Sequence, residues 1–353
     1  MTICYFGIYN NQYSRNKNII KGLRENGVNI IEVTDITPGI KKFWKLFKKY
    51  WKIRKKFDIM IVGFPGQIIV PFAKLLTRKP VVYDLHVSYY DSIAIERKQC
   101  KPYSLKGAWY YFLDWTSCHL ADKVLLDTKE HVRYISKLLH LKADKFIVIY
   151  TGIDDGLFKP IPPKEDKSKK FIISFHGYIQ LLNGMDLVIK AMDSFKDSDI
   201  ELWVIGGGSE YGNIKKLAEE LKLDKVIFFP PMKPEDLINK VSQADLGLGF
   251  FGGNSKKIDR VIANKVYELM ALKVPVLTGE SIATKEHFKH KEHIYYCRKG
   301  EVESIANAIK ELKNNESLRV KIRENAYHYT KEKLNTKVLG EIFLPKLEKL
   351  LNY

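Results

Sequence analysis

The residues with the clearest chemical potential are Lys265 and Glu268, which lie three positions apart in a segment with helical patterning. This spacing places both side chains on one face of a helix. A carboxylate near a helix start can accept hydrogen bonds from the two hydroxyls of a ribose, and a lysine one turn away can meet a phosphate. An exposed salt bridge on an ordinary helix has the same spacing, so both interpretations stay open on the residues alone.

His86 is a second candidate, because it follows a predicted strand at 81–85. Parallel sheets bind their ligands at this end of a strand. A single histidine is more often structural than functional, so it is the position that favours a role in chemistry.

No group of residues indicates a metal or a nicotinamide cofactor. His287, His290 and His293 recur every three positions, but lysine and glutamate surround them, as is typical of a solvated surface. The four cysteines form no CxxC pair. The glycines at 206–208 lack the GxGxxG spacing, which argues against an NAD-dependent oxidoreductase.

The elements that must position these residues alternate between short β-rich runs and helical patterns along all 353 residues. This alternation predicts two α/β domains with parallel sheets. A stretch rich in proline and charge, 158–170, is the best linker candidate. We therefore expect a first domain at 1–163, a second at 164–335, and a C-terminal helix at 336–353 that packs back on the first.

The segment 264–277, NKVYELMALKVPVL, resembles the nucleotide-binding segment of family 4 glycosyltransferases, whose usual form is close to NKxxEYMAxGxPVI. Stretches at 149–160, 175–191 and 202–248 agree with other motifs of that family in order and spacing, and the first domain matches more loosely. The resemblance implies the GT-B fold, in which two Rossmann-like domains face each other across a cleft. The second domain would hold a nucleotide sugar and the first an acceptor.

The resemblance also implies an activity and roles for residues. The activity is a retaining sugar transfer of the hexosyltransferase type, with no metal or other cofactor. Glu268 would hold the donor ribose, Lys265 would lie near the phosphates, and His86 would contact the donor sugar at the reacting centre. The other donor-site residues that it implies are Asn264, Gly177, Tyr178, Gly206 and Gly207.

Two departures from the family pattern affect this site. Many members carry a carboxylate eight positions before Glu268, where this chain has Arg260. The family also often has arginine and lysine where Tyr178 and Asn183 stand. We expect Lys257 in the donor site and Arg260 at the reacting centre to compensate, against the alternatives of a merely solvated loop and of a non-catalytic scaffold with the same fold.

A basic segment at 41–56, KKFWKLFKKYWKIRKK, contains nine basic residues and no acidic one. Its apolar and aromatic residues fill one half of a helix and nearly all of its cations fill the other. Such a helix can pack on a sheet, lie on an anionic membrane, or do both. The residues that we expect at the membrane are Trp44, Lys45, Lys48, Lys49, Trp51 and Lys52.

The charge of +18 is concentrated in residues 1–160, which hold 27 basic and 14 acidic side chains. This excess favours an anionic partner. We expect a membrane-associated acceptor, a lipid-linked saccharide or glycolipid of cell-surface glycan synthesis, bound by Asn10, Arg15 and Lys17. Simple solvation at the start of a helix is the alternative for Arg15 and Lys17. Nucleic acid is the weaker alternative, because one helix holds much of the excess and no known binding module appears.

The chain shows neither an apolar run of membrane-spanning length nor the pattern of a signal peptide. We therefore expect a cytoplasmic protein that binds peripherally to the inner face of the cell membrane.

Overall fold

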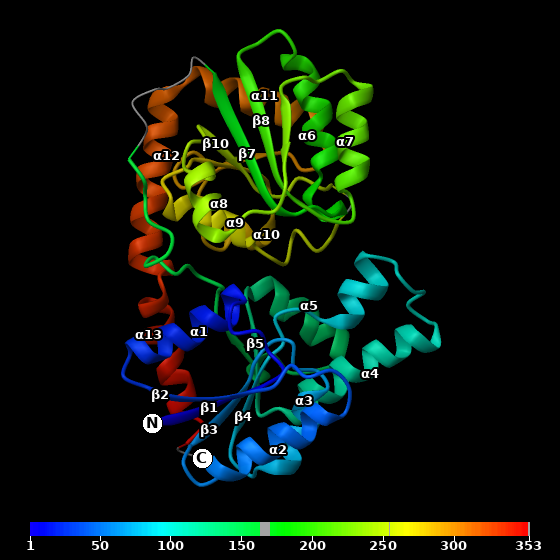
Figure 1. Ribbon diagram of the computed structural model, residues 1–353, viewed down its shortest axis with the longest axis vertical. Helices are drawn as coiled ribbons and strands as arrows, with labels where there is room; N and C mark the ends of the chain where they lie inside the picture. The colour runs from blue at the N-terminus through cyan, green and yellow to red at the C-terminus, as the bar shows by residue number, and fades with distance from the viewer. Residues whose placement is uncertain (163–169, 254, 352–353) are drawn as a thin grey trace. The chain divides into compact units, whose positions relative to one another are not determined.

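The computed structural model describes residues 1–162, 170–253 and 255–351 and divides into two compact units (Figure 1). Unit 1 comprises Met1–Gly152 and Asn335–Tyr353, and unit 2 comprises Ile153–Leu334. The first boundary lies before the expected position of 163/164, because Ile153 is buried in the core of unit 2 and its amide donates to the Leu334 carbonyl. Most of the expected linker, residues 163–169, lies outside the described residues.

Unit 1 is built on a parallel six-stranded sheet with the strand order β2-β1-β3-β4-β5-β6. Its strands are β1 (Thr2–Gly7), β2 (Asn29–Thr34), β3 (Ile59–Val62), β4 (Val81–Asp84), β5 (Lys123–Leu126) and β6 (Phe146–Val148). Buried β-branched and aromatic side chains dominate β1 and β3, as expected of central strands that are covered on both faces.

Helices cover both faces of this sheet. They are α1 (Ser14–Glu25), α2 (Lys41–Ile53), α3 (Ile69–Leu76), α4 (Leu105–Leu120), α5 (Lys129–Leu139) and α13 (Thr336–Glu348), with a π-helical turn at Tyr90–Glu96 and a short 3-10 turn at Ala143–Lys145. One apolar cluster joins the sheet to α2, α3, α4 and α5, and a second joins its other face to α1 and α13.

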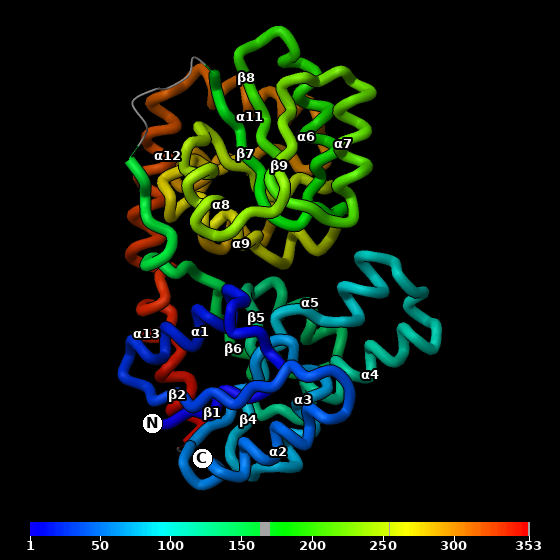
Figure 2. Tube along the Cα trace, viewed as in Figure 1, coloured from blue at the N-terminus to red at the C-terminus, as the bar shows by residue number. Residues whose placement is uncertain are grey.

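The last helix, α13, lies beside the first, α1, although more than 300 residues separate them in sequence (Figure 2). Glycines make the approach so close that a Cβ on Gly340 would lie 2.1 Å from the Gly22 carbonyl oxygen. The Thr336 hydroxyl donates to the Glu25 carboxylate, with 2.6 Å between the oxygens, and the Asn26 amide donates to the Lys337 carbonyl. Residues from both ends of the chain therefore complete one core.

Unit 2 repeats the plan with a parallel sheet in the order β12-β11-β10-β7-β8-β9. Its strands are β7 (Phe171–Tyr178), β8 (Ile200–Gly207), β9 (Val226–Phe229), β10 (Leu246–Leu248), β11 (Val276–Gly279) and β12 (Tyr295–Cys297). Its α-helices are α6 (Met185–Met192), α7 (Tyr211–Glu220), α8 (Pro234–Val241), α9 (Asn264–Ala271), α10 (Ile282–Lys285), α11 (Val302–Asn314) and α12 (Glu316–Tyr329). Short 3-10 turns lie at Leu181–Asn183 and Asp193–Phe195, and a π-helical turn lies at Thr330–Leu334.

The two parallel sheets confirm the predicted α/β class. In unit 2, α6, α7 and α11 pack on one face of the sheet, α8 and α9 pack on the other, and α12 contributes residues to both clusters. This arrangement brings the start of α9 to the carboxyl ends of β7 and β8, where the predicted donor residues lie.

The basic helix α2 divides its apolar residues between two surroundings. Leu46 and Tyr50 are buried against the first sheet, whereas Trp44 and Trp51 are 60% and 52% exposed. The ring of Phe47 lies between the two tryptophans, 5.6 Å from each. The helix therefore packs by part of its apolar half and leaves an aromatic row outside.

Candidate functional site

The candidate site in unit 2 begins where β7 and β8 end in glycine. Gly177 and Gly206 are register partners with φ of +111° and +137°, values that residues with a side chain rarely adopt. A Cβ on Gly206 would lie 2.2 Å from the Gly177 carbonyl oxygen, so the two strand ends meet backbone to backbone. Gly207, by contrast, has room for a side chain.

Lys265 extends from the first turn of α9 toward this glycine edge. Its Nζ lies 3.3 Å from the centre of the Phe175 ring and 3.8 Å from where a Cβ on Gly177 would stand. The side chain is buried, and Nζ has no hydrogen-bond partner within the described residues. Burial lowers the pKa of Lys265 well below its usual range, and the nearby Glu268 carboxylate opposes this shift only in part.

Glu268 lies one turn further along α9 and is bound by a residue of β7. Its Oε2 is 2.8 Å from Nε2 of His176. The side chain of His176 is 5% exposed and that of Glu268 is 19% exposed. The exposed salt bridge between Lys265 and Glu268 that the spacing also allowed is therefore wrong: both side chains are largely buried, and the carboxylate bonds to histidine.

Nothing in the sequence pattern singles out His176. It stands 92 positions before Glu268, and only the packing of α9 on the second sheet brings the two together. The signal that was available is a polar residue between Phe175 and Gly177, inside an otherwise buried strand.

The two positions where the family often has cations carry other side chains here. Tyr178 is 61% exposed at the end of β7. Asn183 is buried, and its Oδ1 accepts from the Gln180 amide at 2.6 Å, which closes the short turn Leu181–Asn183. Asn183 therefore serves the local backbone.

The loop that precedes α9 holds the residues expected to compensate. Arg260 is 4% exposed, and Lys257 is partly buried. The Asp259 carboxylate bonds to the Lys299 ammonium at 2.5–2.6 Å and fixes the loop against the segment after β12. Asn264 begins α9 directly after this loop.

A second group of polar residues lies at the carboxyl edge of the first sheet. His86 follows β4 with φ of +46°, and its Nε2 lies 3.1 Å from the hydroxyl of Tyr13. The ring of Phe64 packs edge-on against His86, with 5.2 Å between ring centres. Asp127 follows β5 and bonds to His131 at 2.6 Å. Burial raises the pKa of Asp127, but His131 and the nearby His86 and Arg15 lower it more, so the net shift is downward. His86 thus lies at the carboxyl edge of the first sheet beside Tyr13 and Phe64, and its role at the reacting centre stays a prediction.

Arg15 does not lie where an acceptor phosphate could reach it, which corrects that expectation. Its side chain is fully buried, and its Nε donates to both oxygens of Asp84 at 2.9 and 3.1 Å. Its Nη1 donates to the Ile149 carbonyl at 2.8 Å. Asn10 is exposed and Lys17 is partly buried, so these two stay candidates for acceptor contact.

The described residues contain neither a membrane-spanning helix nor a cluster of metal-binding side chains. None of their helices is long and apolar enough to cross a bilayer. No three of their histidine, cysteine, aspartate and glutamate side chains gather closely enough to hold a metal ion.

Comparisons with known families match both parts of the chain. A family model described as "Glycosyltransferase Family 4" matches residues 15–157, and one described as "Glycosyl transferases group 1" matches residues 158–329.

Curated relatives match only in part. A D-inositol 3-phosphate glycosyltransferase from Mycobacterium sp. (strain JLS) is 28% identical over 138 residues, which are 36% of this chain and 31% of the relative. One from Acidothermus cellulolyticus is 26% identical over 136 residues, which are 33% of this chain and 30% of the relative. Each match thus spans about a third of the relative's length.

Solved structures match over the whole chain. HepE from Anabaena, crystallised with UDP and glucose, has a TM-score of 0.76 at 14% identity and covers 99% of this chain and 100% of its own. Sucrose-phosphate synthase from Thermosynechococcus elongatus has a TM-score of 0.77 at 14% identity and covers 100% and 99%. At this identity the likeness shows the GT-B fold.

Proposed function

Because the chain belongs to glycosyltransferase family 4, we propose that it transfers a sugar from a nucleotide sugar to an acceptor, with retention of configuration at the anomeric carbon. The observation that supports this most directly is the cluster of Lys265, Glu268 and His176 beside the glycine ends of β7 and β8. It offers a carboxylate for a ribose and a buried amine for a phosphate at the edge where parallel sheets bind nucleotides.

In the proposed reaction, negative charge develops on the leaving group as the glycosidic bond breaks, and the site must stabilise this charge. The leaving nucleoside diphosphate takes the bonding electrons, so fixed hydrogen-bond donors at its phosphates lower the barrier. Lys265 supplies one such donor, and the exposed backbone of Gly177 lies beside it. Arg260 and Lys257 supply the charge that the family's usual cations provide, and His86 of unit 1 contacts the sugar. This set of donors needs no metal ion.

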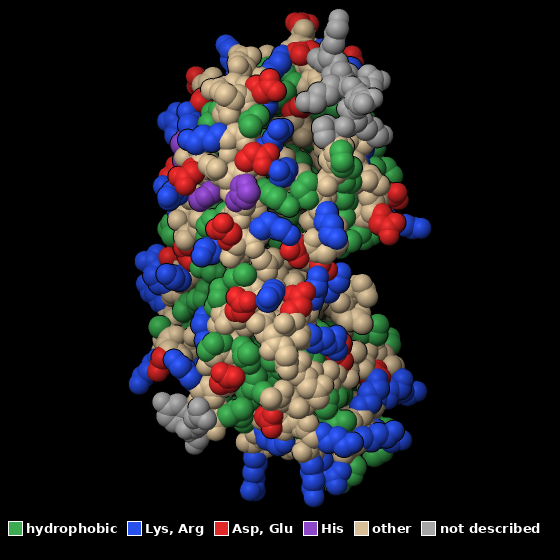
Figure 3. Space-filling view, turned by 90° about the vertical axis from the view of Figure 1, so that its left-hand side faces the viewer, with side chains coloured by type: hydrophobic (Ala, Val, Ile, Leu, Met, Phe, Trp, Pro, Cys, Tyr) green, Lys and Arg blue, Asp and Glu red, His purple; other side chains and the backbone are tan. Residues whose placement is uncertain are grey.

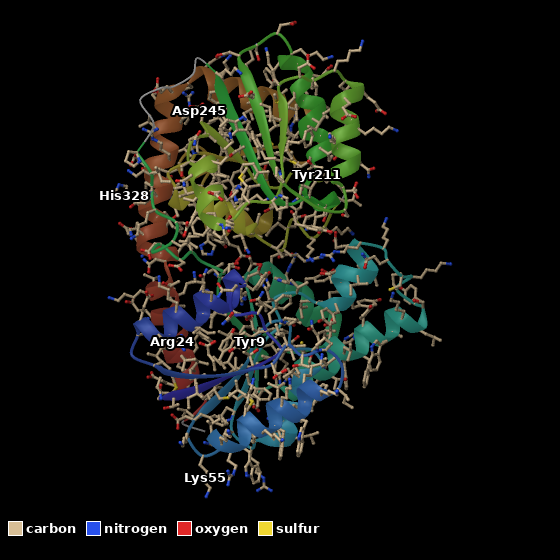
Figure 4. The ribbon with its side chains drawn as sticks, in the orientation of Figure 1. Tyr9, Arg24, Lys55, Tyr211, Asp245 and His328 are labelled. Atoms are coloured by element: carbon tan, nitrogen blue, oxygen red, sulfur yellow. The ribbon has the colours of Figure 1, made fainter. Side chains whose placement is uncertain are left out.

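The acceptor that we propose is anionic and lies at a membrane, as a lipid-linked saccharide or glycolipid of cell-surface glycan synthesis. The names of the curated relatives specify a phosphorylated acceptor. Lysine and arginine side chains crowd the end of the picture where unit 1 lies (Figure 3). Lys55, just after α2, points away from the body of unit 1 (Figure 4). These features support peripheral binding to an anionic cytoplasmic leaflet.

A second helix supports the same membrane contact. On α4, which covers the same face of the first sheet as α2, Trp109 and Phe112 are 55% and 50% exposed and stack at 5.8 Å. Exposed tryptophan beside lysine is typical of side chains at the headgroup level of a bilayer.

Nucleotide binding is tested by thermal unfolding with UDP, GDP, ADP, CMP and dTDP. A nucleotide at 100 times its dissociation constant adds about 2.7 kcal/mol, which is several degrees for a unit of this size. We expect one of these nucleotides to raise the unfolding temperature of the wild type but not that of Glu268→Ala. The control Glu220→Ala, whose carboxylate is 58% exposed on α7, should show the same rise as the wild type. No shift with any nucleotide would favour the non-catalytic scaffold.

Membrane binding is tested by flotation with phosphatidylglycerol vesicles at low salt. We expect the wild type to float, and Lys48→Glu/Lys52→Glu on α2 to reduce the floating fraction. The matched change Lys216→Glu/Lys222→Glu places the same charges on exposed positions of unit 2 and should float like the wild type. Equal flotation of both double variants would exclude α2 as the contact.

A further inference from the structure

Lys265 is a buried amine whose natural ion partner is already bound elsewhere. Glu268 is the carboxylate nearest to it along α9, and that carboxylate bonds to His176 on β7. No ion pair within 4 Å joins Lys265 to any acid of the described chain, and Nζ lacks a hydrogen-bond partner there. The protein therefore buries this amine without giving it an ion-pair partner or a hydrogen-bond acceptor among the described residues.

The described groups around Nζ attract a cation but accept no hydrogen bond from its N–H donors. The ring of Phe175 lies 3.3 Å below it and that of Phe250 lies 5.7 Å away. An aromatic face attracts an ammonium group but accepts none of its three N–H donors in the way an oxygen does. The backbone at Gly177 leaves space beside Nζ where a side chain would otherwise stand.

A bare ammonium in this position costs free energy, whereas a neutral amine costs much less. The charged or titratable groups that face it are Glu268 on α9 and, bonded to that carboxylate, His176 on β7. Burial outweighs the attraction of Glu268, so the pKa of Lys265 is lowered. An ammonium ion at Lys265 is therefore disfavoured relative to one on an exposed lysine.

We propose that Lys265 is neutral in the free protein and becomes an ammonium ion when a nucleotide sugar binds, so that each donor molecule brings one proton into the site. This inference rests on the proposed function, because the diphosphate of the donor supplies the missing acceptor oxygens and the opposing charge. The Nζ lone pair forms the new N–H bond as an O–H or N–H bond of a buffer acid breaks, which leaves the conjugate base of the buffer in solution. Donor binding then becomes tighter as pH falls.

The proton is counted by titration calorimetry at pH 8.0 in phosphate, HEPES and Tris. The slope of the observed enthalpy against the ionisation enthalpy of the buffer gives the protons taken up. The probe is the diphosphate glucose of whichever base shifts the unfolding temperature, with UDP-glucose used first. A nucleotide sugar is preferred to a nucleoside diphosphate because its diphosphate has no terminal phosphate that titrates near neutral pH.

We expect the wild type to take up about one proton per donor and Lys265→Met to take up none while binding more weakly. Lys216→Met, at a position 77% exposed on α7, should match the wild type. His176→Gln should still take up the proton, which excludes the imidazole as its site. Methionine fills a similar volume without a polar group, so Lys265→Met should fold, and Lys265→Gln serves as a second variant.

The affinity supplies an independent measurement. For one full proton, the dissociation constant of the wild type should rise up to about tenfold per pH unit above neutrality, while that of Lys265→Met should stay flat. Binding by the wild type without proton uptake, or equal uptake by Lys265→Met, would overturn the inference and leave the proposed function intact. Failure of every nucleotide sugar to bind would overturn both.

Discussion

Replacing Arg15 with methionine should destabilise unit 1 severely and leave acceptor recognition unchanged in the protein that remains folded. The guanidinium is fully buried and joins three parts of unit 1: α1, the end of β4 through Asp84, and the segment after β6 through the Ile149 carbonyl. Loss of the arginine would leave the Asp84 carboxylate buried without its counter-ion.

Breaking a buried ion pair by removing one partner costs about 3–5 kcal/mol. In a unit of this size each kcal/mol lowers the unfolding temperature by about 2–4 °C, so we expect a fall of about 6–20 °C. The double variant Arg15→Met/Asp84→Leu removes the stranded charge as well and should recover most of this loss.

The loss should also depend on pH. Burial already raises the pKa of Asp84, and Arg15 is the group that opposes this shift. Without Arg15 the native state binds a proton on Asp84 more tightly than the unfolded chain does, so lowering the pH stabilises Arg15→Met. We expect the gap in unfolding temperature between wild type and Arg15→Met to be smaller at pH 5 than at pH 8.

Calorimetric unfolding scans of the single and double variants at both pH values measure these effects. A melting temperature of Arg15→Met within about 1 °C of the wild type would refute the reasoning, since a broken buried pair costs several times more. If that variant also raised the KM for acceptor, Arg15 would be an acceptor residue after all.

Three further predictions concern other parts of the chain. Gly340→Ala should lower the free energy of unfolding by about 1–3 kcal/mol in denaturant unfolding, because its Cβ meets the backbone of α1. The control Gly212→Ala, which has open space in α7, should leave this free energy unchanged or raise it by up to about 1 kcal/mol. Equal effects of the two substitutions would argue against the close crossing of α1 and α13. Burial raises the pKa of Asp114 to about 6, so between pH 7 and pH 5 the wild type should gain about 1 kcal/mol over Asp114→Asn, and parallel pH profiles of denaturant unfolding would contradict this. His176→Leu should raise the KM for the donor more than it lowers kcat, because the Glu268 carboxylate loses its hydrogen-bond partner. His176→Gln keeps an N–H donor and should restore part of the loss. A change in kcat alone would count against this positioning role.

The sequence predicted those parts of the site that neighbouring residues determine. Lys265 and Glu268 lie on one short helix, so their spacing alone brings them to the same place. His176 escaped prediction because its contact with Glu268 depends on how a helix packs on a sheet. Arg15 was misjudged for the same reason: its partner Asp84 lies 69 positions away, and a basic residue at a helix start looks solvated until that contact is known.

The basic helix shows the same limit on a larger scale. The period of its sequence predicts an apolar half, but a helix packed on a sheet buries a narrower stripe than that. Leu46 and Tyr50 fill the stripe, and Trp44 and Trp51 remain at its margins. Amphipathic patterning therefore identified the helix without saying which of its aromatic residues the core would accept.

The contact between α1 and α13 has a consequence for how the protein is made. A ribosome completes the first six strands early, then makes all of residues 153–334 before α13 emerges. At about 5–20 residues per second, that interval lasts on the order of 10–40 s. During it the groove at Gly22 has no helix to fill it, so the nascent first unit should stay sensitive to proteases and chaperones until the final helix arrives. Unit 2 needs Leu334 in its own core, so it too is complete only at the end of this interval, and the two units receive their last residues within a few seconds of each other.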